Sequence, residues 1–162
     1  MKFGGLDLSL TSTGWAVLDD DGALVSAGRV RPGEAWPIGQ RYDFLAESIW
    51  KAMQQVDVVA RERPFANGRG GGDTDAALFG VHAVVQRELW LRQERDEIPQ
   101  VAPSTLLKLA TGSGKARKGS KAEVIDAAIE RWGSDVDQTD IADACWVAEW
   151  LRLEWQSGRL TG

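Results

Sequence analysis

Hydrophobic runs in the first thirty residues predict three consecutive strands. Residues 3–18 contain two short apolar runs separated by small hydroxyl residues, and an acidic turn at residues 19–22 ends the second run. Short apolar runs bounded by turn residues are typical of antiparallel strands. A third run covers residues 23–30 and is broken by the Arg-Pro-Gly sequence at residues 31–33. The pattern therefore predicts a three-stranded meander.

The rest of the chain alternates between helical and strand patterns. Apolar residues recur at nearly helical spacing over residues 37–54, and residues 56–60 form a short strand of the buried type. Ser120 and Glu123 have the spacing of a capping box, which predicts a helix that opens at Ser120 and ends near residue 132. Further elements are expected as helices at residues 76–95 and 103–111, a strand at 99–102, and a last helix from about residue 137 to 150.

Composition narrows the class of protein. A length of 162 residues, with 43% hydrophobic and 27% charged residues, fits one soluble domain covering residues 1–162. No apolar run reaches the ~20 residues that span a bilayer, so no membrane partner is expected. A lone cysteine, Cys145, cannot form an internal disulfide, and no basic segment followed by an apolar one opens the chain. These features predict a cytoplasmic protein with a thiol in its core.

The distribution of charge indicates a polyanionic partner although the net charge is −5. Residues 108–121 carry five cations and no acid, and residues 61–69 carry three arginines. Local charge rather than total charge steers a polyanion. The cations concerned are Arg61, Arg63, Arg69, Lys108, Lys115, Arg117, Lys118 and Lys121.

Four carboxylates in three distant segments are the candidate chemistry. Asp7 interrupts an apolar run, where desolvating its charge would cost several kcal/mol without a compensating cation. Glu62 follows the fourth predicted strand, and Asp140 and Asp143 share one face at the start of the last helix. Two hard divalent cations would compensate these charges, and paired metals suit phosphodiester hydrolysis. Two alternatives remain. Asp7 could be a structural residue in an ion pair, and Asp140 and Asp143 could simply complement the dipole at the start of their helix.

Lys121 and two glycine-rich segments allow more than one interpretation. Lys121 lies at the start of a predicted helix, where the dipole disfavours a cation, so a function is as plausible as a solvated side chain. Residues 67–72 are interpreted as a plain connection, because no Lys-Ser or Lys-Thr follows the glycines. Residues 112–121 do not match a phosphate-binding loop either, because no Gly-Lys-Ser or Gly-Lys-Thr follows a glycine at the end of a strand with the required spacing. The only histidine, His82, lies in the predicted long helix and is interpreted as structural.

Several motifs in order resemble the RuvC-type Holliday junction resolvases of the RNase H-like, or retroviral integrase, superfamily. Gly5-Leu6-Asp7 followed by Thr13-Gly14-Trp15 is similar to that family's first strand and turn, and Glu62 matches its second acid. Residues 102–104, 111–114 and 121–124 are similar to its Ala-Pro, Thr-Gly-x-Gly and Lys-x-x-Val segments. Residues 140–144 match its closing Asp-x-x-Asp-Ala.

The resemblance implies a five-stranded mixed sheet flanked by helices on both faces, a homodimer, and symmetric nicking of four-way DNA junctions. It implies that Asp7, Glu62, Asp140 and Asp143 bind two Mg²⁺ ions per active site, for which Mn²⁺ would substitute. Lys121 would be the active-site lysine, and Phe65 the aromatic that stacks on a base near the crossover. DNA contacts are expected from Phe65, Arg63, Arg69, Lys115, Arg117 and Lys118.

Departures from the family pattern leave substrate selectivity open. Leu8-Ser9 replaces the Pro-Gly usual in bacterial members, Arg61-Glu62-Arg63 replaces Ile-Glu-Gln, and the segment at residues 115–120 is more basic and slightly longer. These changes suggest a divergent member, such as one encoded by a virus and acting in the host cytoplasm. Two other functions are weighed: a non-catalytic module that binds branched DNA, and an actin-like ATPase or sugar kinase. The latter needs a second, nucleotide-closing domain, for which 162 residues leave no room.

Overall fold

The computed structural model describes residues 1–64, 72–93 and 97–160. Its strands are β1 (Lys2–Asp7), β2 (Thr13–Asp19), β3 (Leu24–Val30), β4 (Val58–Glu62) and β5 (Gln100–Val101). Its helices are α1 (Ile38–Met53), α2 (Gly72–Gln93), α3 (Pro103–Thr111), α4 (Ser120–Trp132) and α5 (Thr139–Gln156), with a 3₁₀ turn at Ser134–Val136. The expected elements are present, with the fourth strand two residues later than predicted and the long helix starting four residues earlier.

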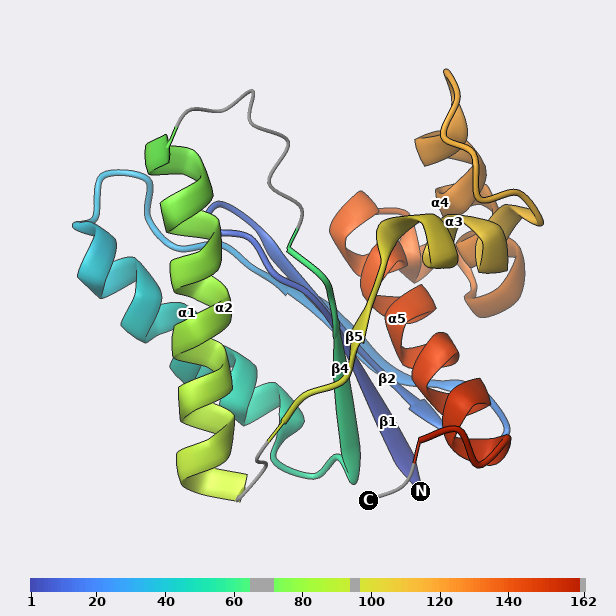
Figure 1. The fold of residues 1–162 in the computed structure, drawn as a ribbon, viewed down its shortest axis with the longest axis horizontal. Helices are drawn as coiled ribbons and strands as arrows, with labels where there is room; N and C mark the ends of the chain where they lie inside the picture. Colours follow the sequence, from blue (N-terminus) through green and yellow to red (C-terminus); the bar gives the residue numbers. More distant parts are fainter. Residues whose placement is uncertain (65–71, 94–96, 161–162) are drawn as a thin grey trace.

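All five strands form one mixed sheet, as predicted. The strand order is β3-β2-β1-β4-β5, with the first three strands antiparallel and β4 and β5 parallel to β1. Helices α1 and α2 lie on one face of the sheet, and α3, α4 and α5 lie on the other (Figure 1). Since β1 and β4 are parallel neighbours, their last residues, Asp7 and Glu62, lie at the same edge.

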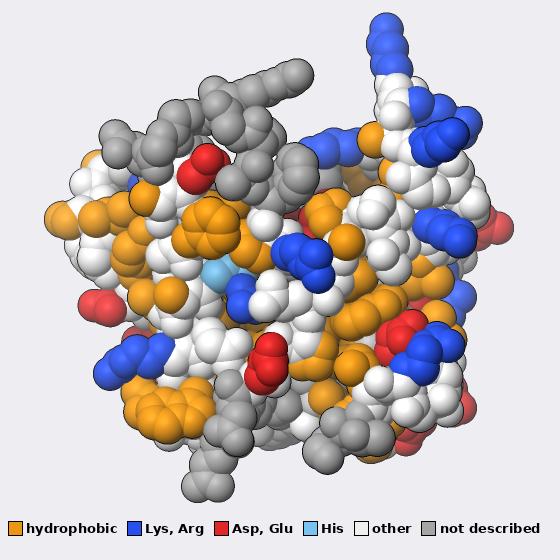
Figure 2. Space-filling view, in the orientation of Figure 1, with side chains coloured by type: hydrophobic (Ala, Val, Ile, Leu, Met, Phe, Trp, Pro, Cys, Tyr) orange, Lys and Arg blue, Asp and Glu red, His pale blue; other side chains and the backbone are white. Residues whose placement is uncertain are grey.

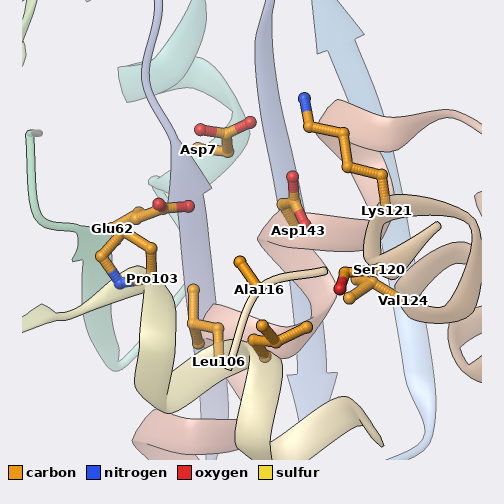
Figure 3. Close-up of a pocket in the computed structure, with 10 residues that line it drawn as sticks. Asp7, Glu62, Pro103, Leu106, Ala116, Ser120, Lys121, Val124 and Asp143 are labelled. Carbon is orange, nitrogen blue, oxygen red and sulfur yellow. The ribbon is translucent and has the colours of Figure 1, made fainter. Parts of the chain in front are cut away.

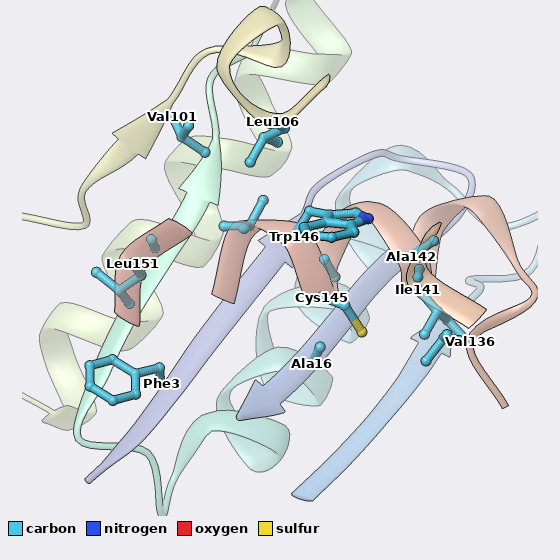
Figure 4. Close-up of a cluster of buried hydrophobic side chains, with 14 residues drawn as sticks. Phe3, Ala16, Val101, Leu106, Val136, Ile141, Ala142, Cys145, Trp146 and Leu151 are labelled. Carbon is cyan, nitrogen blue, oxygen red and sulfur yellow. The ribbon is translucent and has the colours of Figure 1, made fainter. Parts of the chain in front are cut away.

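Alternation along the strands separates two hydrophobic cores. On the α5 side, Phe3 and Ala60 pack with Cys145, Trp146 and other apolar residues of α5 (Figure 4). On the opposite side, Leu6 and Val59 pack against buried residues of α1 and α2. Because side chains alternate between faces with a period of two, Asp7 and Glu62 share the face that α5 covers. The sequence register thus directs both acids toward one helix.

Strand β1 and helix α5 approach each other closely enough that their backbones touch. A Cβ atom added at Gly5 would overlap the carbonyl oxygen of Ala144 and the backbone nitrogen of Ala148. A Cβ at Gly14, the partner of Asp7 in β2, would overlap the carbonyl of Asp140. Glycine at these two positions therefore sets the distance between the sheet and the start of α5.

A buried polar network fixes the other end of α5 to the turn between β2 and β3. Arg152 donates to the Glu149 carboxylate at 2.8 Å and to the Asp20 carbonyl at 3.1 Å. Glu149 also accepts from Arg131 of α4 at 2.5 Å. The Trp132 indole donates to the Gly22 carbonyl at 3.0 Å. Both ends of α5 are therefore held against the meander.

The predicted capping box at the start of α4 is wrong. Gly119, with φ +93°, is the N-cap, and Ser120 is the first helical residue. The Ser120 hydroxyl accepts a hydrogen bond from the Arg117 backbone at 2.9 Å, and Glu123 pairs with the Arg117 guanidinium at 2.8 Å. Ser120 and Glu123 thus both bind Arg117 of the preceding loop instead of capping the helix. Lys121 consequently occupies the second helical position.

The sequence also makes the long helix at residues 76–95 the candidate for the subunit contact, with only some of Leu78, Val81, Val85 and Leu89 at that contact because part of their face must pack on the sheet. The structure buries Val81, Val85 and Leu89 completely in the core shared with α1, so these three cannot meet another chain.

Within the described residues, no helix has the length and apolar character needed to cross a membrane.

We predict that Gly5→Ala lowers the free energy of unfolding by roughly 3 kcal/mol, because the added methyl group must displace the α5 backbone. Gly39→Ala is the matched control: nothing lies within 4 Å of a Cβ there, and alanine favours the helix. Urea unfolding of both variants measures the difference. Equal stability of Gly5→Ala and wild type would show that β1 and α5 can separate without loss.

Candidate active site

Three of the four predicted acids line one pocket. Asp7 and Glu62 come from the ends of β1 and β4, and Asp143 comes from the start of α5. The pocket has a volume of about 350 Å³, and Lys121 of α4 contributes to its wall (Figure 3). Its floor is apolar and includes Leu106 of α3. Residues separated by more than one hundred positions in the sequence are thus brought around one opening.

Asp140 lies beside this pocket rather than in its lining. Its carboxylate accepts a hydrogen bond from the Ser12 hydroxyl, and Arg31 in turn donates to that hydroxyl at 3.4 Å. The charge of Asp140 still raises the pKa of Asp7 and of Asp143, so it belongs to the same electrostatic cluster. Sequence reasoning missed the contact with Ser12, although the run of hydroxyl residues before β2 was a signal of polar partners there.

Burial and mutual repulsion make the acid cluster electrostatically unfavourable. Burial is the main cause that raises the pKa of Asp7 well above its usual value, followed by the charges of Asp143 and Glu62. Burial and then Asp143 raise the pKa of Glu62 to about 7. The pKa of Asp143 is raised to about 6, again chiefly by burial. Desolvation and like charges both disfavour the ionised form of a carboxyl group. The raised pKa values therefore show that the positive charge near these three acids is too small to compensate them.

Lys121 partly offsets this repulsion. Its ammonium group lowers the pKa of Asp7, Glu62 and Asp143, which requires the positive charge to lie near all three. Lys121 lines the same pocket as these three acids, beside which the sequence analysis expected it. The remaining shifts are still upward, so one lysine does not balance the three carboxylates.

The residues present fit divalent cations in chemistry. Carboxylate oxygens are hard ligands of the kind that Mg²⁺ and Mn²⁺ prefer. In the part of the chain that the structure describes, no three Asp, Glu, His or Cys side chains converge closely enough to hold an ion as they stand. An ion held by three of these carboxylates at once would therefore require them to turn toward a common centre.

Exposed cations lie next to the pocket on the loop between α3 and α4. Lys115, Arg117 and Lys118 are exposed on this loop, and its Ala116 lines the acid pocket. Figure 2 shows Lys and Arg side chains gathered over the projecting part of the molecule at upper right, where Figure 1 places this loop. Arg63, also exposed, follows β4. The predicted DNA-contacting residues Phe65 and Arg69 lie outside the described residues.

His82 and Cys145 have the structural surroundings expected for them. His82 is buried, and its ring contacts the Arg61 guanidinium. Burial and the neighbouring Arg61 charge lower the pKa of His82 to about 4. Burial alone raises the pKa of the Cys145 thiol to about 12, so this thiol stays protonated in the core.

Comparison with known proteins finds relatives that are similar over most of the chain, although no protein-family model matches it. The crossover junction endodeoxyribonuclease RuvC of Bradyrhizobium sp. strain BTAi1 is 24% identical over 160 residues. RuvC of Rhodopseudomonas palustris strain TIE-1 is 28% identical over 152 residues. Each match covers 89% of this chain and 82% of the relative. The chain is thus similar to RuvC along most of its length.

Solved structures support the same fold. A Thermus thermophilus RuvC structure matches with a TM-score of 0.79 at 17% identity, covering 98% of this chain and 97% of that one. T. thermophilus RuvC in complex with a Holliday junction substrate matches with the same TM-score at 16% identity, over the same shares. The Fowlpox virus Holliday junction resolvase matches with a TM-score of 0.58 at 13% identity, covering 99% of this chain and 100% of that one. The chain therefore has the predicted RNase H-like fold.

We predict that the protein, free of divalent cations, loses stability as pH rises from about 4 to about 7. In this range the folded state retains protons on Glu62 and Asp143 that the unfolded state releases, so folding becomes less favourable. Asp7→Asn removes one of the repelling charges and should raise the free energy of unfolding at pH 7. Denaturant titrations across this range provide the measurement.

The control is Asp43→Asn, which neutralises an exposed aspartate on α1. It should leave the pH profile unchanged. If stability instead rises steadily from pH 4 to 7 and Asp7→Asn is destabilising, the acids are compensated within the fold.

Proposed function

We propose that this chain is a structure-selective endodeoxyribonuclease that nicks four-way DNA junctions. The observation that carries the proposal is the convergence of Asp7, Glu62, Asp143 and Lys121 around one pocket. Ionised carboxylates that raise one another's pKa destabilise a fold, so their gathering indicates a role with cations. The names of the RuvC relatives, which span most of the chain, support the choice of a crossover junction as substrate.

Asp7, Glu62 and Asp143 would hold two Mg²⁺ ions, with Asp140 as the fourth acid. Bound in this way, the ions would stabilise the attacking and leaving oxygens of the phosphodiester. Asp140 could reach an ion directly only by giving up the hydrogen bond from Ser12. While that bond persists, the charge of Asp140 acts on Asp7 and Asp143 through space.

Lys121 and the α3–α4 loop would serve the DNA backbone. Lys121 is the cation that lies among the acids, so it suits the phosphate that is cut, where fixed charge stabilises the transition state. Lys115 and Lys118 are exposed farther out and suit the neighbouring phosphates. Arg117 already forms an ion pair with Glu123, so its positive charge would be shared between that ion pair and the DNA phosphates.

A homodimer would supply the second active site that symmetric cleavage requires. The outer side of α2 carries exposed residues at helical spacings of three or four: Ala76, Phe79, Ala83, Arg87 and Trp90. Phe79 is 48% exposed and Trp90 50%, so this stripe leaves two large aromatic side chains uncovered. We propose that this stripe, rather than the face formed by Val81, Val85 and Leu89, pairs with its copy about a two-fold axis.

The function is tested by incubating the protein with four-way junction, flap and duplex DNA. We expect paired nicks in the junction with Mg²⁺ or Mn²⁺ and none with EDTA. Asp7→Asn should cut at least ~100-fold more slowly, while its junction affinity stays equal or rises because repulsion with phosphate falls. Tight junction binding by wild type without any cleavage in Mg²⁺ would favour the non-catalytic module instead.

Lys121→Ala should separate chemistry from binding. We expect the single-turnover cleavage rate to fall about 100-fold with little change in junction affinity, because Lys121 lies among the acids. Lys118→Ala, the control from the exposed loop, should weaken affinity more than rate. If both variants lose affinity and rate in the same proportion, Lys121 is one more backbone contact.

The dimer contact is tested with the double variant Phe79→Asp/Trp90→Asp. Light scattering should report two chains for wild type and one for the variant, because charge at the centre of an apolar contact is costly. Ile38→Asp, which changes a side chain that is 53% exposed at the start of α1, is the control and should remain a dimer. On a supercoiled cruciform, the monomeric variant should leave nicked circles where wild type yields linear DNA.

A further inference from the structure

A second cavity adjoins the acid pocket. It lies between α3 and the α3–α4 loop and has a volume of about 440 Å³. Pro103, Leu107 and Ala116 line both cavities, so the two spaces share a wall. Nothing assigned so far to the acids, Lys121 or the basic loop uses this space.

The walls of the cavity are held in place by hydrogen bonds and close packing. Gly112, with φ +76°, donates its backbone N–H to the Lys108 carbonyl at 2.8 Å and turns the chain back along α3. A Cβ at Gly114 would lie 3.1 Å from the Ser104 carbonyl, so the loop runs directly beside the helix. On the other side, the Arg63 backbone donates to the Val101 carbonyl at 2.8 Å. The cavity is therefore formed before any ligand arrives.

Its lining is aliphatic with two polar side chains, those of Arg63 and Ser104. Apolar walls with a few polar groups suit a flat heterocycle that stacks on its faces and forms hydrogen bonds at its edge. Continuity with the acid pocket indicates the source of that heterocycle. If a phosphodiester lies at the acids, the base of an adjoining nucleotide can extend past Pro103, Leu107 and Ala116 into the second cavity.

We propose that this cavity receives one nucleobase next to the phosphate that is cut, and that it sets a base preference at that position. The inference rests on the proposed nuclease function. Bases at a junction crossover are the easiest to unstack, so the cost of insertion is smallest there. Arg63 offers only N–H donors, which favours a base with acceptors such as the O6 and N7 of guanine. Guanine should therefore be preferred over adenine.

The test uses single-turnover cleavage of junctions in which each of the nucleotides flanking the cut is made abasic or exchanged between guanine and adenine. For wild type we expect one position where loss of the base slows cleavage roughly 10-fold, and where guanine is cut faster than adenine. Ser104→Trp, a change at an exposed site, fills the cavity and should remove the dependence on that base. Arg63→Gln should reduce the preference for guanine.

Thr105→Trp is the matched control, since Thr105 is the exposed neighbour of Ser104 and does not line the cavity. It should keep the wild-type profile, and melting curves confirm that each variant is folded. Uniform cutting of all these junctions by wild type would overturn the base cavity but leave the nuclease intact. The same holds if Ser104→Trp keeps the wild-type profile. Failure of wild type to cut any junction in Mg²⁺ would overturn the proposed function itself.

Discussion

The direct contact between the backbones of β1 and α5 determines the geometry of the site. Gly5 and Gly14 leave no side chain between the sheet and the helix, so Ala144, Ala148 and the Asp140 carbonyl lie against the strands. Asp143 follows Asp140 by one helical turn and reaches the edge where β1 and β4 end. A bulkier residue at either glycine would move the helical acid away from the acids of the strands.

This arrangement places mutually repelling carboxylates next to a direct contact between backbones. Burial raises the pKa of Asp7, Glu62 and Asp143, so at neutral pH their ionisation works against folding. The two cores on either side of the sheet and the Glu149–Arg152 network at the far end of α5 provide the opposing stability. Proteins commonly tolerate such strain where a site needs it.

Local pattern predicted the individual strands and helices, because turn residues and apolar spacing mark them in the sequence. The family resemblance implied the mixed sheet with helices on both faces and one site for Asp7, Glu62, Asp140, Asp143 and Lys121. The structure shows that sheet and brings all of these except Asp140 into the lining of one pocket. Local pattern failed where tertiary contacts replace local ones. The Ser120 hydroxyl serves Arg117 instead of capping its helix, and Ser12 reaches Asp140 across 128 positions. The cavity beside α3 could not be predicted either, because a loop folded back on its own helix forms it.

The α3–α4 loop has a consequence for how such proteins diverge. Its hydrogen bonds go to its own neighbours: Thr111 and Gly112 bond to carbonyls of α3, and Arg117 bonds to Ser120 and Glu123 of α4. The acids, in contrast, depend on the sheet and on α5. Mutations and insertions can therefore accumulate in the loop without moving the carboxylates. Substrate choice can change over evolutionary time while the chemistry of the pocket stays constant.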